Sequence, residues 1–175
     1  MDEMHEDIHP VSDEMGRPHG HWLRTADLLC TTADSLYDRA ASIPLRPVMR
    51  CPNGADVSHF RPKEKPPVPP ELASIVGRGK PVIGYFGALA KWFDYELIRR
   101  IARERPQWEI VLIGVDYDKS LRESGVKKLP NVHYLGTKPY EVLPHYAAYF
   151  DVATVPFLVN DVTQSTSPIK LFEYM

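Results

Sequence analysis

A cluster of prolines limits the fold of this chain more than any other feature of its sequence. Five of the 17 prolines in the 175 residues fall between Pro62 and Pro70. Proline has no backbone N–H and a fixed φ angle, so this stretch cannot form the interior of a helix or a central strand. Such segments favour an extended, semi-rigid backbone. We therefore predict a linker over residues 62–70, between a first domain part at 1–61 and a second domain at 71–175.

After the linker, short apolar runs alternate with segments of helical periodicity. The pattern predicts strands at 81–86, 109–113, 132–135 and 152–156, and helices at 94–104 and 140–149. Continuously apolar strands are typical of a parallel sheet covered by helices on both faces. The second domain is therefore predicted to be an α/β, doubly wound, Rossmann-like domain.

The part before the linker shows one strand-helix-strand pattern, and neither end of the chain looks complete. A strand is predicted at 27–32, a helix at 35–42 and a second strand at 47–51, closed by a Pro-Asn-Gly turn. The last segment has Ser167 as a helix N-cap and Pro168 at the first helical position, but no stop signal follows before Met175. We expect a protein truncated at both ends.

Composition excludes several classes of function. The formal net charge of -2, with acidic and basic residues intermixed, gives no basic patch for a nucleic acid. Cys30 and Cys51 form no Cys-x-x-Cys pair, so we expect two small buried thiols in a reducing, cytoplasmic location rather than a disulfide or a zinc site. No apolar run approaches the ~20 residues that span a bilayer, and the polar start of the chain lacks a signal-peptide pattern.

The first candidate site follows the first strand of the second domain. Gly87 comes at the carboxyl end of that strand, and a short loop with Lys91 leads to the next helix. Backbone amides in such a loop can approach a phosphate, and the helix dipole favours its negative charge. The alternative is that Gly87 only permits a tight turn and that Lys91 is a solvated surface residue.

The second candidate site is the start of the last helix. Ser167 stands at its beginning, and Lys170 and Glu173 lie three residues apart, so they share one helix face. A lysine near a helix N-terminus suits a pyrophosphate, and a carboxylate can accept hydrogen bonds from both ribose hydroxyls. The alternative is an exposed i, i+3 ion pair. Because both candidate sites follow strands of one parallel sheet, we expect them to meet at the edge where doubly wound folds bind ligands.

Other patterns carry less weight. The residues from His5 to His9 match the His-Glu-x-x-His pattern of zinc peptidases, but Pro10 follows at once and no third ligand has the usual spacing, although His19 and His21 are near. We interpret the aromatic residues at 92, 93 and 95 as helix-packing surface. The histidines at 133 and 145 are expected to be partly buried, with His133 near the crevice.

In this order and spacing, the motifs resemble those of the family 4 retaining glycosyltransferases with the GT-B fold, also described as group 1 transferases. The resemblance runs from about Ala26 to Met175 and includes a crossing between domains, Pro52-Asn53-Gly54-Ala55-Asp56 through Phe60-Arg61-Pro62. It continues with Ile83-Gly-Tyr-Phe-Gly87 and ends with Ser167-Pro168-Ile169-Lys170-Leu171-Phe172-Glu173-Tyr174-Met175.

The resemblance implies transfer of a sugar from a nucleoside diphosphate sugar to a hydroxyl of a glycan or lipid-linked acceptor, in polysaccharide biosynthesis. It further implies retention at the anomeric carbon, no cofactor, no required metal, and peripheral membrane association of the full-length enzyme. Gly87 would line the phosphate or sugar pocket, Lys91 or Lys170 would neutralise the diphosphate, and Glu173 would bind ribose. Many members carry a second glutamate, which would fall at Ser165 here.

Most of the acceptor domain of such an enzyme is absent from this sequence, and the catalytic residues stay unknown. We therefore expect this chain to be inactive alone. Two alternatives are a sugar-nucleotide 2-epimerase of the same architecture, and a non-catalytic, degenerate fragment with no ligand.

Overall fold

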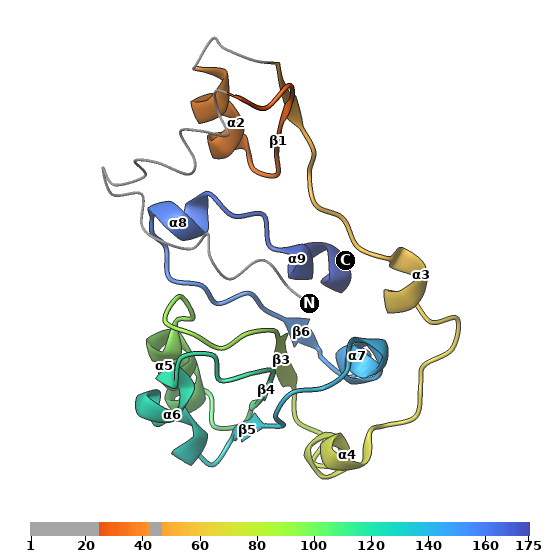
Figure 1. Ribbon diagram of the computed structural model, residues 1–175. Helices are drawn as coiled ribbons and strands as arrows, with labels where there is room; N and C mark the ends of the chain where they lie inside the picture. Colours follow the sequence, from red (N-terminus) through yellow and green to blue (C-terminus); the bar gives the residue numbers. More distant parts are fainter. Residues whose placement is uncertain (1–24, 43–46) are drawn as a thin grey trace. The chain divides into compact units, whose positions relative to one another are not determined.

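The structure is a computed structural model that describes residues 25–42 and 47–175 (Figure 1). Two compact units divide the chain, and each is described by itself. One comprises the residues up to Gly54 together with Val159–Ile169, and the other comprises Ala55–Leu158 and Lys170–Met175. The predicted linker at 62–70 therefore falls inside the second unit, and the assignment of the chain to two domains with that boundary remains a prediction.

The first unit contains the predicted strand-helix-strand pattern. Strands β1 (Leu29–Thr31) and β2 (Val48–Arg50) pair in parallel, and helix α2 (Asp34–Ala41) connects them. A short helix, α8 (Asp161–Gln164), belongs to the same unit. Its N-cap Asn160 and Thr163 form a capping box, in which each side chain bonds the backbone N–H of the other.

The prediction of two buried thiols is wrong. Cys30 is exposed and Cys51 is only half-buried. The reason is the small size of the layer around them, because Ala40 is the one buried apolar side chain among the described residues of this unit. Two three-residue strands and one helix cannot enclose side chains on both faces of the ribbon.

The second unit is built on a four-stranded parallel sheet. Its strands are β3 (Val82–Phe86), β4 (Glu109–Ile113), β5 (Val132–Tyr134) and β6 (Val152–Ala153), arranged in the order β5-β4-β3-β6. The chain moves outward from β3 through β4 to β5 and then returns to the other side of β3. The order of the strands thus reverses between β3 and β6, which is the switch point where open α/β sheets bind ligands.

Helices cover both faces of this sheet, as predicted (Figure 1). Side chains of β4 alternate between two buried clusters: Ile110 and Leu112 pack with α5 (Tyr95–Glu104), α6 (Ser120–Ser124) and the 3-10 turn η2 (Val126–Lys128). Val111 and Ile113 pack with α4 (Pro70–Val76) and α7 (Leu143–Ala147). Every residue of β4 is buried, which explains why its sequence is continuously apolar after the first residue.

The boundaries of several elements differ from those predicted, for local reasons. The predicted helix at 140–149 is divided into a 3-10 turn, η3 (Tyr140–Val142), and α7, because Pro144 fits only in the first turn of a helix. Pro70 likewise begins α4, so the helix-free part of the proline-rich stretch ends at Pro69. Sequence patterns also missed the short helices α3 (Val57–Phe60), α4, α6 and α8.

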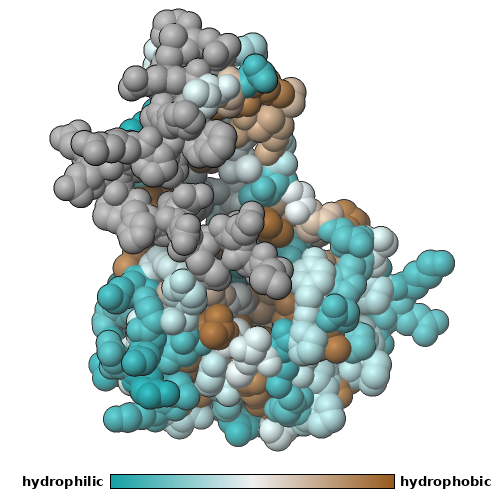
Figure 2. Space-filling model, viewed as in Figure 1, coloured by the Kyte–Doolittle hydropathy of each residue, from teal (hydrophilic) through white to brown (hydrophobic). Residues whose placement is uncertain are grey.

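In the view of Figure 2, the unit with the four-stranded sheet exposes mostly hydrophilic residues, with separate hydrophobic ones between them. Within the described ranges, no helix is both long and apolar enough to cross a bilayer.

Candidate nucleotide-binding site

Two glycines shape the carboxyl edge of the sheet. Gly87 directly follows β3 and has a φ of +143°, and Gly114 directly follows β4 with a φ of +141°. L-amino acids rarely adopt this backbone conformation. A Cβ atom at position 114 would overlap the backbone carbonyl oxygen of Gly87, so the two segments pass each other backbone to backbone. The sequence interpretation missed Gly114, although it follows its strand just as Gly87 follows β3.

Lys170 covers the open face of Gly87. A Cβ atom at position 87 would overlap Cε of Lys170, and it would lie 2.7 Å from Nζ of Lys170 and 2.9 Å from the hydroxyl of Tyr85. The absence of a side chain at position 87 therefore creates the space that the lysine fills. This contact brings the start of helix α9 (Ile169–Tyr174) to the carboxyl end of β3, as the sequence predicted.

Tyr174, the residue after Glu173, fixes helix α9 to β3. The backbone N–H of Phe86 donates to the hydroxyl of Tyr174 at 3.1 Å, and the two rings meet edge to face at 4.8 Å. Arg61 donates to the backbone carbonyl of Met175 at 2.6 Å. Because these contacts fix the end of α9, Lys170 and Glu173 are presented at a defined place on the sheet edge.

Burial disfavours the charged forms of both Lys170 and Glu173, so it shifts their pKa values in opposite directions. Burial lowers the pKa of the Lys170 ammonium, and the nearby carboxylate of Glu173 opposes this effect. Burial raises the pKa of Glu173, against the opposing influence of Lys170, of a hydrogen bond with Tyr140 and of His59. Each group would therefore gain from a ligand that replaces the lost water, such as an anion at the lysine or hydroxyl groups at the carboxylate.

The other predicted site residues are placed less favourably. Lys91 is exposed, its backbone N–H donates to the Asp118 carboxylate at 3.0 Å, and it is not among the atoms nearest to the open face of Gly87. Ser167 belongs to the first unit, precedes the observed start of α9, and accepts a hydrogen bond from Asn53 on its backbone carbonyl at 2.6 Å. The structure therefore brings Gly87, Lys170 and Glu173 together, but it does not add Lys91 or Ser167 to them.

The predictions for the aromatic residues and the histidines are only partly confirmed. Phe93 is buried against Tyr85, with ring centroids 4.9 Å apart, so its packing role is confirmed. His145 is exposed, which corrects the prediction that it is partly buried, because α7 turns it away from the core. The His5–His9 motif and the histidines at 19 and 21 lie outside the described residues, and the described part of the chain holds no cluster of His, Cys, Asp and Glu suited to a metal ion.

A second polar cluster lies at the start of β4. Glu109 has a fully buried side chain, and its carboxylate contacts Arg78 at 3.1 Å, Lys80 at 3.4 Å and His133 at 2.5 Å. Burial raises the pKa of Glu109, but the hydrogen bonds with His133 and Arg78 outweigh it, so the pKa is lowered overall. His133 is partly buried, as predicted, but it is engaged by a residue at the amino end of β4 and does not approach the ligand edge.

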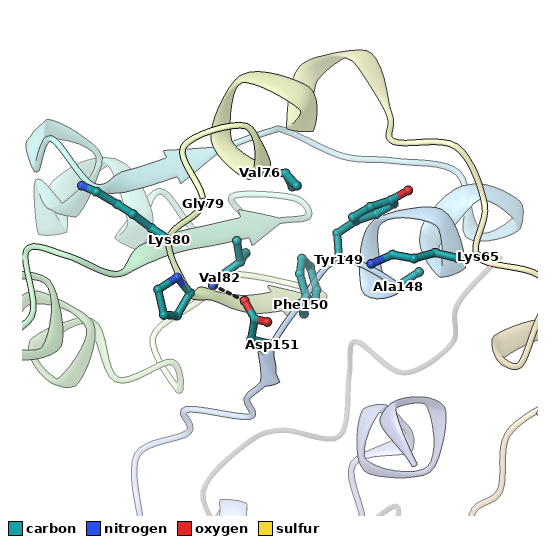
Figure 3. Close-up of a pocket in the computed structure, with 10 residues that line it drawn as sticks. Lys65, Val76, Gly79, Lys80, Val82, Ala148, Tyr149, Phe150 and Asp151 are labelled. Carbon is teal, nitrogen blue, oxygen red and sulfur yellow. Dashed lines mark hydrogen bonds between the residues drawn. The ribbon is translucent and has the colours of Figure 1, made fainter.

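A pocket of about 510 Å³ also lies at the amino end of β3 (Figure 3). Polar side chains that line this pocket already interact with other groups of the protein. Asp151 accepts from the backbone N–H of Val82 at 2.7 Å, and Lys65 lies over the ring of Tyr149 at 4.2 Å. This pocket is at the opposite end of β3 from Gly87, and we assign the ligand edge to the glycines because open α/β sheets bind ligands at the carboxyl ends of their strands.

Comparisons with known proteins agree with this architecture. No protein-family model matches the sequence. The TuaH protein of Bacillus subtilis strain 168, whose name assigns it to teichuronic acid biosynthesis as a glycosyltransferase, is 26% identical over 159 residues, which are 87% of this chain and 39% of TuaH.

Two solved structures show the same fold. Alr3699/HepE of Anabaena, determined in complex with UDP and glucose, matches with a TM-score of 0.57 and 21% identity, over 77% of this chain and 39% of HepE. A glycosyltransferase from Rickettsia africae ESF-5 matches with a TM-score of 0.58 and 9% identity, over 83% of this chain and 42% of that protein. This chain is thus related in sequence to TuaH, spans 39% of its length, and adopts part of the GT-B fold of glycosyltransferases.

Proposed function

We propose that this chain forms the donor-binding part of a glycosyltransferase that takes a sugar from a nucleoside diphosphate sugar. The observation that carries the proposal is the position of Lys170, which lies over Gly87 at the switch point of the sheet with Glu173 beside it. The sequence relation to TuaH, and the UDP and glucose bound to HepE, support a nucleotide sugar as the ligand.

The arrangement suggests a division of roles. The Lys170 ammonium compensates the negative charge that develops on the diphosphate as the bond between sugar and phosphate breaks, and a preorganised cation in a partly desolvated site is effective at this. The Glu173 carboxylate accepts hydrogen bonds from the ribose hydroxyls. Gly87 leaves room for the lysine and for close approach of the phosphates. In this scheme protein cations replace a metal ion, and the reaction retains the anomeric configuration.

Other parts of the proposal concern the whole protein. The acceptor is a hydroxyl of a glycan or of a lipid-linked glycan, the enzyme works in the cytoplasm, and the full-length protein associates with the membrane surface. Turnover needs residues of an acceptor-binding domain in addition to those described, so a chain of these 175 residues is expected to bind the donor but not to complete the transfer.

Binding of nucleotides to the chain tests the proposal. UDP, GDP and the corresponding nucleosides are titrated separately up to millimolar concentration, and chemical shifts of backbone amides are followed by NMR. We expect saturable binding of at least one diphosphate, with the shifts concentrated around residues 87 and 170. The nucleoside should bind at least about tenfold more weakly, because it lacks the charge that Lys170 recognises.

A charge-neutral variant supplies the control. Lys170→Met keeps the length of the side chain but removes the ammonium, and it should lower diphosphate affinity about tenfold or more while leaving nucleoside affinity nearly unchanged. Lys91→Met removes an exposed lysine outside the contact with Gly87 and should have a small effect. Failure of both diphosphates to bind would refute the proposed function.

A further inference from the structure

Side chains from three separate segments meet next to the proposed ribose-binding carboxylate. They are His59 of α3, Tyr140 of η3 and Glu173 of α9. The rings of His59 and Tyr140 are stacked, with centroids 4.9 Å apart and an interplanar angle of 18°. Nε2 of His59 also lies 3.1 Å from the backbone carbonyl oxygen of Tyr140. Two independent contacts therefore fix the position of Tyr140 relative to α3.

Aromatic packing connects this pair to α9. Phe60 meets the Tyr140 ring edge to face at 5.6 Å and stacks on Phe86 at 5.8 Å. Phe86 in turn contacts Tyr174, the residue after Glu173, through both its ring and its backbone N–H. The aromatic residues thus connect η3, through Phe60 of α3, to the strand that holds α9. On α9, the Glu173 carboxylate interacts with the Tyr140 hydroxyl through a side-chain hydrogen bond.

Chemistry fixes the direction of the hydrogen bond between them. A phenol donates its O–H and a carboxylate only accepts. In agreement, the hydrogen bond with Tyr140 lowers the pKa of Glu173, whereas burial first and Glu173 second raise the pKa of Tyr140. When one carboxylate oxygen is held by the phenol, the group loses rotational freedom, and its remaining lone pairs are available to two neighbouring hydroxyls.

We propose that Tyr140 is a positioning residue for ribose recognition. Its hydroxyl, kept in place by the His59 ring, orients the Glu173 carboxylate so that it accepts hydrogen bonds from the 2′ and 3′ hydroxyls of a nucleoside diphosphate. This inference rests on the proposed function. It adds Tyr140 to the site as a residue that acts on the ligand only through Glu173, without contact to the phosphates or to the transferred sugar.

A comparison of ribose with deoxyribose measures this role. UDP and 2′-deoxy-UDP, and likewise GDP and 2′-deoxy-GDP, are titrated against the 175-residue chain by NMR. The ratio of the two dissociation constants is the penalty for losing the 2′ hydroxyl. We expect a penalty of about tenfold in the unchanged chain, as for a hydrogen bond to a charged group, and about threefold or less in Tyr140→Phe.

The matched control is Tyr149→Phe. The Tyr149 hydroxyl also donates a hydrogen bond, to the backbone carbonyl of Pro66 at 2.5 Å, but this bond is made to the proline-rich segment and not to the site. This variant should keep the tenfold penalty. A second variant, Glu173→Gln, should reduce the penalty to the same extent as Tyr140→Phe, and the double variant should reduce it no further, because the tyrosine acts through the glutamate.

The outcomes separate this inference from the function on which it rests. If Tyr140→Phe weakens UDP and 2′-deoxy-UDP equally, the residue is merely structural and the inference is wrong, although the proposed function stands. The inference would also be wrong if Tyr140→Phe kept the tenfold penalty for the missing 2′ hydroxyl while Glu173→Gln reduced it. No binding of either diphosphate to the folded chain would overturn both the inference and the proposed function.

Discussion

Lys170 fills the volume that a side chain at Gly87 would occupy, although the two residues are far apart in the sequence. The contact joins the first turn of α9 to the loop that follows β3. A substitution at position 87 therefore acts on the placement of the lysine as well as on the backbone.

Gly87→Ala is expected to impair binding more than stability. Two of the three atoms nearest to the new Cβ belong to the flexible end of Lys170, which can swing aside, and the third is the hydroxyl of the buried Tyr85 at 2.9 Å. A small shift of that ring therefore adds to a backbone strain of about 1–3 kcal/mol. The displaced ammonium should lower diphosphate affinity several-fold. Urea unfolding and NMR titration with UDP and GDP measure the two effects.

Gly79→Ala is the matched control for that variant. Gly79 also has a positive φ, of +65°, but an added Cβ would have open space around it. Its stability loss should be similar, while nucleotide affinity stays unchanged. Equal affinities for the two variants would show that the space at position 87 does not determine where Lys170 lies.

Gly114→Ala is expected to destabilise the chain more severely than Gly87→Ala. Here the added Cβ would overlap the backbone carbonyl of Gly87, which cannot move without separating β3 from β4. Overlap with backbone and strain at a φ of +141° together should cost about 3 kcal/mol or more. Urea unfolding measures the difference, and a Gly114→Ala variant as stable as Gly87→Ala would contradict this packing.

Glu173→Gln is expected to stabilise the ligand-free chain at neutral pH. The folded-state pKa of Glu173 is raised above its ordinary value of 4.5, mainly by burial, so its stabilising contribution is full below pH 4.5 and is lost as pH rises through the folded pKa. The variant, which stays neutral, should therefore exceed the unchanged chain in stability at pH 7, and the difference should shrink towards pH 4.

Urea unfolding at several pH values measures this difference. A Glu173→Gln variant that is less stable at pH 7 would mean that the carboxylate is stabilised by its neighbours more than burial disfavours it. Such a result would contradict the conclusion that burial raises the pKa of Glu173 above its ordinary value.

Glu109→Gln is expected to show the opposite dependence on pH. Hydrogen bonds with His133 and Arg78 lower the pKa of Glu109 despite its burial, so the stabilisation is present above pH 4.5 and is lost as pH falls through the folded pKa. At pH 7 the variant should lose about 1–3 kcal/mol, because a buried group would lose charge-assisted hydrogen bonds.

Glu96→Gln is the control for Glu109→Gln. Glu96 forms an ion pair with Arg99 on α5, but its side chain is 74% exposed, and such pairs contribute little to stability. The change in urea unfolding should be below about 0.5 kcal/mol. Similar losses of stability in Glu96→Gln and Glu109→Gln would contradict the larger contribution that we assign to the buried cluster around Glu109.

Local sequence patterns were sufficient to predict the main strands and the longest helix among the residues that the structure describes. The run at 109–113 became β4 with the predicted bounds, and Asp94 caps α5 through the backbone N–H of Leu97 at 2.8 Å. Periodicity and capping are properties of neighbouring residues, so they are visible in the sequence. The short helices were missed because four to seven residues contain too few turns to show a period.

The sequence by itself determined that apolar strands would form a covered parallel sheet, and which residue types could bind an anion and a diol at its edge. Only the tertiary structure decided that Lys170, and not the exposed Lys91, lies on Gly87. It also decided that Gly114 is needed where two backbones cross, and that His59 stacks on Tyr140. The physical reason is that a residue pattern specifies the local backbone, whereas contacts between distant segments depend on strand order and on how side chains fill the space between them.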